Sequence, residues 1–260
     1  MKRSLVRFHG LLNQFGLDPR KLVKSLIGFP RYLRDFFHFR SGYTGRINFL
    51  PYLHDWYEEG GTTATEYFWQ DLVVARMIFA AAPEKHVDVG SRVDGFVAHI
   101  ASFREIEVFD VRPISAQIPG VIFKQSDLMS PVSTMESYCD SLSCLHALEH
   151  FGLGRYGDPV DPKGYERGLA NMARLLTENG VCYLSVPIGV DRVEFNAHRV
   201  FDPRVIIDLA LQHSLEVRAL SVIQPNGKLE VVTFDEPQLS RLANQQYALG
   251  LFVFHKTRQL

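Results

Sequence analysis

The sequence predicts an α/β protein built on a doubly wound, mostly parallel sheet of seven strands, with helices on both faces and a helical extension at the N-terminus. From residue 86 onward, apolar runs of strand length alternate with helical patterns, and the runs have the two-sided apolar character of strands covered on both faces. Before residue 86, only helical patterns and loops occur. We therefore expect residues 1–85 to form a basic helical extension or lid, and residues 86–260 to form the sheet domain.

The expected elements follow in order along the chain. Residues 20–40 predict two short amphipathic helices broken at Pro30, and residues 63–82 predict a helix that ends before Pro83. The predicted strands are residues 85–90, 105–112, 120–127, 138–146, 180–187, 215–223 and 249–256. The predicted helices of the sheet domain lie near residues 96–102, 164–176 and 203–214. Residues 224–248 have the least regular pattern.

The composition, 46% hydrophobic and 22% charged, is that of a folded globular protein and excludes disordered and fibrous classes. The apolar run "MIFAAAP" is too short to span a bilayer, and "MKRSLVRFHG" lacks the apolar segment of a signal peptide, so we expect a cytoplasmic location. Cys139, Cys144 and Cys182 form no CxxC pair and predict neither disulfides nor a thiolate zinc site. We expect them to be buried.

Charge is unevenly distributed along the chain. Residues 1–46 hold ten Lys and Arg against two Asp, a balance of +8, and the remainder carries 18 basic and 27 acidic residues, a balance of −9. A basic arm of this kind suits an anionic membrane surface, a nucleic acid or an acidic protein, and equally a solvated helical face. No pattern of a nucleic-acid-binding module is present, so we expect no nucleic acid partner.

The segment "HVDVGSRVDGF" reads as a strand, a turn and the start of a helix whose amide groups can hold a negative group. Asp110 ends the next strand at the spacing at which a carboxylate accepts hydrogen bonds from a ribose diol. Asp127 ends the third strand, where it can accept from an adenine amino group while Leu128 packs on the ring. Three successive carboxylates favour an adenosyl ligand over a pyrophosphate, because they repel phosphates.

Beyond the fourth strand, "LHALEHFGLGRYGDPVDP" is rich in polar side chains. His146 and His150 share a helix face and allow a metal site, although no third ligand is apparent and we do not expect a divalent metal. Later, Glu194, Asn196 and His198 alternate, so that an extended backbone would point all three to one side. His198 is the candidate general base, and a structural histidine bonded to Glu194 is the alternative.

In order, the segments at residues 86–96, 108–113, 125–129, 145–151, 176–189 and 252–256 resemble the motifs of Rossmann-like S-adenosylmethionine-dependent methyltransferases. More narrowly, "DVGSRVDGFVAHIASF", "CLHALEHFGLGRYGDPVDP" and "VEFNAHRVFDP" resemble an uncharacterised family first catalogued from nematodes as a domain of unknown function. Bacterial members of that family tend to lie among surface-polysaccharide genes.

This resemblance implies that Asp88, Gly90, Ser91 and Gly95 surround the methionine part of S-adenosylmethionine. It places Asp110 and Val111 at the ribose, Asp127 and Leu128 at the adenine, and His146 beside the cofactor. Arg92 and Asp94 stand where the superfamily has glycines, and Arg92 is expected to compensate by reaching the cofactor's carboxylate. The catalytic candidates are His198, Glu149 and His150.

The resemblance further implies O-methylation of a sugar hydroxyl, in a surface glycan or its nucleotide- or lipid-linked precursor, with S-adenosylhomocysteine as the other product. Tyr67, Phe68 and Trp69 begin a helix that would close over the cofactor, or would simply seal the core edge. An alternative function is a non-catalytic adaptor that docks on a glycan-assembly complex at the inner membrane through the basic N-terminus. An NAD-dependent oxidoreductase is disfavoured because no G-x-G-x-x-G turn is present.

Overall fold

A computed structural model describes residues 15–58, 60, 61, 63, 65–131 and 135–258 of the chain. It forms two compact units, residues 1–62 and residues 63–260. Helix α3 (Glu66–Ala81) lies in the second unit, whereas we assigned it to the extension from the sequence. It belongs there because Val74, Ala75 and Ile78 are buried in one apolar cluster with residues of the sheet. Lys2, Arg3 and Arg7 of the basic segment lie outside the described residues.

The first unit contains one long helix and the segment that follows it, residues 43–58, which we call the return segment. Helix α2 (Pro19–Gly42) starts at Asp18, whose carboxylate accepts from the amides of Arg20 and Lys21, and a short 3-10 turn, η1 (Asp55–Tyr57), follows later. The predicted break at Pro30 is wrong, because α2 continues through it. Proline's φ is compatible with a helix, and contacts of the following turns with the return segment stabilise the continuation.

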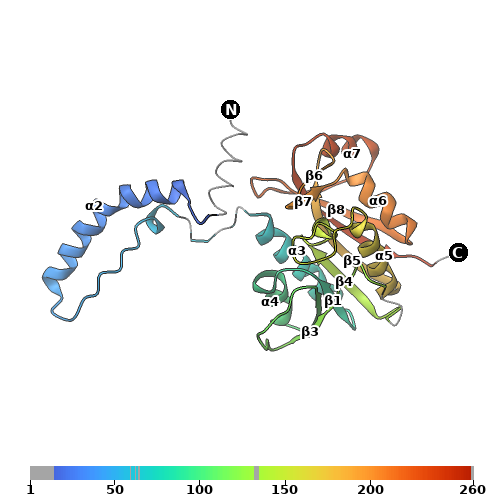
Figure 1. Cartoon of the computed structure of the whole chain (residues 1–260), viewed down its shortest axis with the longest axis horizontal. Helices are drawn as coiled ribbons and strands as arrows, with labels where there is room; N and C mark the ends of the chain where they lie inside the picture. Colours follow the sequence, from blue (N-terminus) through green and yellow to red (C-terminus); the bar gives the residue numbers. More distant parts are fainter. Residues whose placement is uncertain (1–14, 59, 62, 64, 132–134, 259–260) are drawn as a thin grey trace. The chain divides into compact units, whose positions relative to one another are not determined.

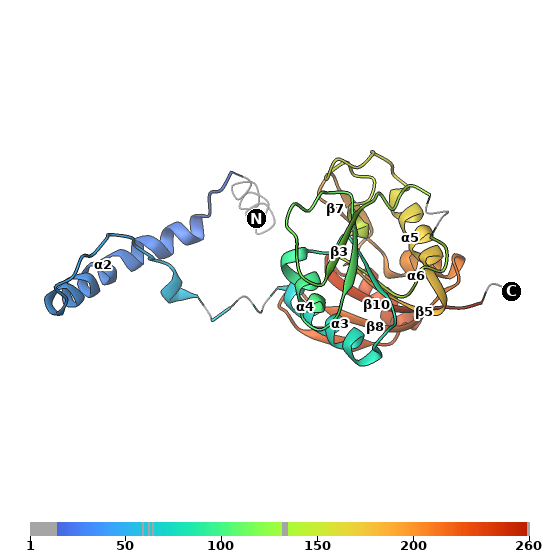
Figure 2. The same cartoon turned by 90° about the horizontal axis from the view of Figure 1, so that it is seen from below.

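The second unit is an eight-stranded sheet in the order β3-β2-β1-β4-β5-β10-β8-β9 (Figures 1 and 2). Strands β1 to β5 pair in parallel, β10 is antiparallel to β5 and β8, and β9 is antiparallel to β8. The strands are β1 (His86–Val89), β2 (Ile106–Asp110), β3 (Val121–Gln125), β4 (Cys139–Leu145), β5 (Leu176–Ile188), β8 (Leu215–Ile223), β9 (Leu229–Val232) and β10 (Ala248–Lys256).

All seven predicted strands are confirmed, and β9 is an eighth that we did not predict. The chain reverses between β8 and β9 in a turn where Gly227 has φ +80° and its amide donates to the Gln224 carbonyl. The irregular stretch therefore contains a hairpin, and the Asn226-Gly227 pair is its sequence signal. Helix α7 (Glu236–Ala243) follows, capped by Asp235.

Helices cover both faces of the sheet, as the doubly wound prediction requires (Figure 2). Helix α3 packs on one face with η2 (Val93–Val97) and α4 (Ala98–Ala101). Helices α5 (Gly164–Leu175), α6 (Pro203–Gln212) and α7 pack on the other. The three cysteines are free, and they are buried in the apolar cluster on the face covered by α5, α6 and α7. Among the described residues, no helix has the length and apolar character needed to cross a membrane.

The expected extended run through Glu194, Asn196 and His198 is wrong. Strands β6 (Arg192–Glu194) and β7 (His198–Val200) form an antiparallel hairpin in which Glu194 is directly opposite His198. The amide of Ala197 donates to the Glu194 carbonyl across the turn, so the backbone reverses where we expected alternation. The hairpin brings His198 towards the carboxyl end of the sheet.

Phe252 and Phe254 in β10 are buried in the apolar cluster on the face covered by α5, α6 and α7, and their ring centroids lie 5.7 Å apart. Phe252→Ala removes a fully buried ring, and we expect the free energy of unfolding to fall by about 3–5 kcal/mol. Phe234, which is 43% exposed, provides the matched control, and Phe234→Ala should change it by less than about 1 kcal/mol. Urea denaturation measures both, and equal losses in the two variants would contradict this core assignment.

Candidate functional site

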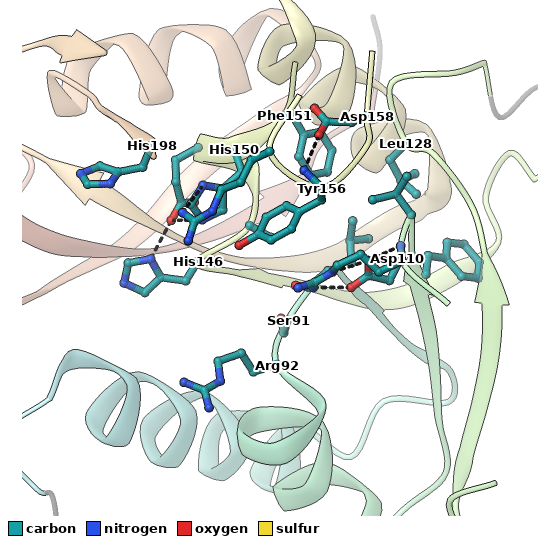
Figure 3. Close-up of a pocket in the computed structure, with 18 of the residues that line it drawn as sticks. Ser91, Arg92, Asp110, Leu128, His146, His150, Phe151, Tyr156, Asp158 and His198 are labelled. Carbon is teal, nitrogen blue, oxygen red and sulfur yellow. Dashed lines mark hydrogen bonds and ion pairs between the residues drawn. The ribbon is translucent and has the colours of Figure 1, made fainter. Parts of the chain in front are cut away.

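A cavity of about 690 Å³ opens at the carboxyl ends of β1, β2 and β4 (Figure 3). Parallel strands place their final residues at one edge, so loops that are distant in sequence meet there. The cavity brings together, of the residues predicted from the sequence, Gly90, Ser91, Arg92, Asp110, Val111, Asp127, Leu128, His146, Glu149, His150 and His198. Asp88 and Gly95 are not among the residues that line it.

The turn after β1 is shaped by Gly90 and Asp88. Gly90 has φ +72°, and a Cβ there would lie 2.9 Å from the Cβ of Ala147, so the position requires glycine. Asp88 is fully buried beneath the turn and accepts from the amide and hydroxyl of Ser91 at 3.0 and 2.6 Å and from the Ser143 hydroxyl at 2.5 Å. Burial raises the pKa of Asp88 to about 6. Asp88 therefore holds the turn in place from below.

The second half of this turn faces α3. A Cβ on Gly95 would lie 2.6 Å from Asp71 Oδ2, so this glycine is needed for the approach of α3. Arg92 is paired with Asp94 through its Nε and Nη2 at 3.1 and 2.7 Å, and its guanidinium lies 5.3 Å from the centre of the Tyr67 ring. The contact of Arg92 with a cofactor carboxylate stays a prediction.

Asp110, at the end of β2, is engaged by a neighbour that we did not predict. Arg112 donates to the two Asp110 carboxylate oxygens through Nε at 3.0 Å and Nη2 at 2.6 Å, and its guanidinium lies 4.4 Å from the centre of the Tyr156 ring. Figure 3 shows Tyr156 between His150 and the Asp110 side of the cavity. Asp110 Oδ1 also accepts from the Arg112 amide at 2.8 Å, so Oδ2 is the oxygen that retains a lone pair with which it can accept a ligand hydroxyl.

The turn after β3 supplies an apolar wall. Leu128 is 2% exposed, and Asp127 Oδ1 accepts from the Met129 amide at 2.9 Å. Buried Asn171 of α5 donates to the carbonyls of Leu128 and Ser130 and so fixes this turn. Asn171 could not be predicted from the sequence, because an asparagine inside a helix has no particular pattern.

His146, in the turn after β4, lies between two carboxylates. Its Nδ1 is 2.6 Å from Glu149 Oε1 and its Nε2 is 3.1 Å from Glu66 Oε1, while the Tyr247 hydroxyl donates to the same Glu66 oxygen at 2.7 Å. The Tyr67 ring stacks on the imidazole at 4.6 Å. Burial opposes the charged imidazolium, but the two carboxylates prevail and raise the pKa of His146 to about 9. We call His146, Glu66, Glu149 and Tyr247 the His146 cluster.

Glu149 is completely buried and stays ionised. Burial acts to raise its pKa, but the charge and hydrogen bond of His146 more than offset this and lower it. Among the residues that the structure describes, its Oε2 finds no hydrogen-bond partner. The Glu149 carboxylate contacts both histidines and is among the residues that line the cavity, and its role as a catalytic candidate stays a prediction.

His150 is the neutral histidine of the site. Its Nδ1 is 2.7 Å from the Ala197 carbonyl oxygen, which can only accept, so Nδ1 carries the proton and Nε2 keeps a lone pair. Burial lowers the pKa of His150, and the nearby Glu149 carboxylate opposes this. His146 and His150 therefore differ in charge: near neutral pH, His146 is a cation and His150 is a neutral base.

Other polar residues after β4 hold the backbone of this segment. The Asp158 carboxylate accepts from the amides of Gly152, Gly154 and Tyr156. The buried guanidinium of Arg199 in β7 donates to the carbonyls of Glu149 at 3.2 Å and Phe151 at 2.6 Å. Among the described residues, no group of three or more His, Cys, Asp or Glu side chains has the geometry to hold a metal ion.

Residues 121–216 match a family model described as "Caenorhabditis protein of unknown function, DUF268". This agrees with the narrower resemblance drawn from the sequence. A comparison with curated proteins finds no match.

Solved structures share the fold at low sequence identity. The 1,6-didemethyltoxoflavin-N1-methyltransferase of Burkholderia thailandensis, solved with S-adenosylhomocysteine, has a TM-score of 0.53 and 14% identity over 73% of this chain and 79% of that chain. The N-methyltransferase NodS of Bradyrhizobium japonicum WM9 has a TM-score of 0.50 and 11% identity over 75% and 89%. The [4+2]-cyclase SpnF has a TM-score of 0.51 and 12% identity over 72% and 83%. The second unit therefore has the Rossmann-like fold of methyltransferases.

The His146 cluster makes stability depend on pH. The pKa of His146 is about 9 in the folded protein against an ordinary 6.5, so the folded state holds an extra proton between these values. Its contribution is fully present below pH 6.5 and is lost as pH rises towards 9, amounting to roughly 3 kcal/mol at most. Urea denaturation of wild type and Glu66→Gln should show a smaller loss over this range in the variant.

Glu216, an exposed carboxylate paired with Arg218, provides the control for this experiment. Glu216→Gln should leave the pH dependence of unfolding unchanged. If Glu66→Gln and wild type lose the same free energy between pH 6.5 and 9, the assignment of His146 as a paired imidazolium is wrong.

Proposed function

We propose that this chain is an S-adenosylmethionine-dependent O-methyltransferase. The observation that carries the proposal is the single cavity in which the β1 turn, the Asp110 carboxylate, the Asp127–Leu128 turn and two differently protonated histidines meet. The fold and the S-adenosylhomocysteine found in two similar structures support the choice of cofactor.

The residues present fit this cofactor. The left-handed Gly90 lets the backbone of the β1 turn come close to a ligand without a side chain in between. Asp110 would accept from the ribose hydroxyls, and Leu128 and Phe109 would flank the adenine. When bound, S-adenosylmethionine supplies a methyl group on a sulfonium that a nucleophile can attack.

The other half of the cavity would hold the acceptor. An alcohol is a poor nucleophile at neutral pH and needs a base within reach of its proton. His150 is the better base, because the Ala197 carbonyl fixes its tautomer and leaves the lone pair on Nε2, which lies 3.7 Å from Glu149 Oε1. His198, our first candidate from the sequence, also lines the cavity, and burial lowers its pKa as well, so it is the second candidate.

We further propose a sugar hydroxyl of a surface glycan or its precursor as the acceptor. Support comes from the family resemblance and from the acceptor half itself, where Glu66, Arg155 and the hydroxyls of Tyr67, Tyr156 and Tyr247 line the wall. Such a mixture of donors, acceptors and aromatic rings suits a polyol. We also propose that the protein is cytoplasmic.

One observation favours the non-catalytic adaptor as a second candidate. Arg112 already occupies the Asp110 carboxylate with three hydrogen bonds, as it would in a protein that no longer needs a ribose there. Cofactor binding therefore discriminates between the two functions.

Calorimetry with S-adenosylhomocysteine tests the cofactor site. Wild type should bind, and Asp110→Ala should weaken binding at least tenfold, because it removes a charged acceptor of a ribose hydroxyl. Asp208, an exposed acid on α6, provides the control, and Asp208→Ala should bind like wild type. Absence of binding by the folded wild type at millimolar ligand would rule out the methyltransferase and favour the adaptor.

The base is tested through the product. His150→Ala should lower the rate of methyl transfer about 10²–10⁴-fold and leave affinity for S-adenosylhomocysteine within about twofold. Cells that carry the wild-type gene, the variant gene or no gene are compared by mass spectrometry of their surface glycan. We expect one methyl group to be missing without the gene and depleted in the variant. Full methylation by His150→Ala, together with its loss in His198→Ala, would assign the base to His198.

A further inference from the structure

The long helix of the first unit leaves an apolar face bare. In α2, Leu22, Leu26, Phe29 and Phe37 recur at helical spacing and lie on one side. Together with Val23 and Ile27 they form a stripe whose members are 43–67% exposed. We call these six residues the α2 stripe.

The return segment packs on the other side of α2. Tyr32 and Phe36 contact the Phe49 ring at 5.2 and 5.5 Å, and the guanidinium of Arg31 lies 4.0 Å from the centre of the Trp56 ring. These contacts determine which face of α2 is covered, and the α2 stripe is not that face. Exposed apolar patches of this extent are rare on proteins that remain free in water.

The surroundings of the α2 stripe point to an anionic surface. Residues 15–58 hold seven Lys and Arg against four Asp and Glu, a balance of +3. Basic residues beside an apolar stripe are the features of helices that lie in the headgroup region of a bilayer. A second copy of this unit would bring like charges together.

We propose that the first unit is a membrane anchor that lies in the plane of a bilayer rich in anionic phospholipid. The α2 stripe enters the boundary between headgroups and acyl chains, and Arg20, Lys21 and Arg34 contact lipid phosphates. Pro30 and the charged residues of α2 fit a helix that lies on the membrane. The anchor holds the second unit at the bilayer surface, where lipid-linked acceptors are found.

Vesicle co-sedimentation of the full chain tests this anchor. We expect binding to phosphatidylglycerol–phosphatidylcholine vesicles, weaker binding at high salt, and little binding to phosphatidylcholine alone. Leu26→Asp with Phe37→Asp should lower the partition coefficient at least tenfold, and Arg20→Gln or Lys21→Gln about fivefold each. Val231, an apolar residue of the sheet unit that is 82% exposed, provides the matched control, and Val231→Asp should bind like wild type.

Two results would overturn the proposal. One is wild type that binds neither kind of vesicle, or a Leu26→Asp, Phe37→Asp variant that binds as well as wild type. The other is a lipid-free dimer in light scattering that the same substitutions dissociate, which would assign the α2 stripe to a second copy. Circular dichroism confirms that the variants are folded, and calorimetry with S-adenosylhomocysteine should be unchanged in them, so the result is independent of the proposed enzymatic function.

Discussion

The buried imidazolium of His146 is the interaction on which the site depends. It joins Glu66 at the start of α3 to Glu149 after β4, and Tyr247 before β10 bonds to the same Glu66 oxygen. Three distant parts of the chain thus meet around one positive charge. Buried charges are stable only when they are paired, so the loss of one member leaves the others uncompensated. The His146 cluster therefore fixes the part of the cavity wall that these three segments form.

The same cluster determines what His150 can do. Glu149 lies between the two histidines, with Oε1 at 2.6 Å from His146 Nδ1 and 3.7 Å from His150 Nε2. Burial lowers the pKa of His150, and the nearby Glu149 carboxylate only partly offsets this, so His150 remains neutral. The Ala197 carbonyl then holds its other nitrogen protonated. Two histidines of different charge thus line the cavity on either side of one buried carboxylate.

The sequence predicted the sheet and one edge of the site because both have local signals. Two-sided apolar runs mark parallel strands, and strand ends fall at one edge, so Asp110, Asp127 and His146 could be placed together. The contact between Glu66 and Tyr247 could not be predicted, because the two residues lie 181 residues apart in sequence and no sequence pattern indicates that they meet. Arg112 was missed because a basic residue in a turn carries no sign of its partner. Pro30 misled the helix prediction because packing on the return segment outweighs one lost hydrogen bond.

The fold alone does not determine the chemistry. Two of the similar structures are methyltransferases and one is a cyclase, so the same sheet accommodates different reactions. The Asp110 edge of the cavity would serve any adenosyl ligand, whichever reaction follows. What distinguishes this chain is the proposed acceptor half, where a neutral His150 with an unprotonated Nε2 lines the cavity. A proton acceptor held in one tautomer has little use in a protein that only binds, and this favours the enzyme over the adaptor despite the pairing of Arg112 with Asp110.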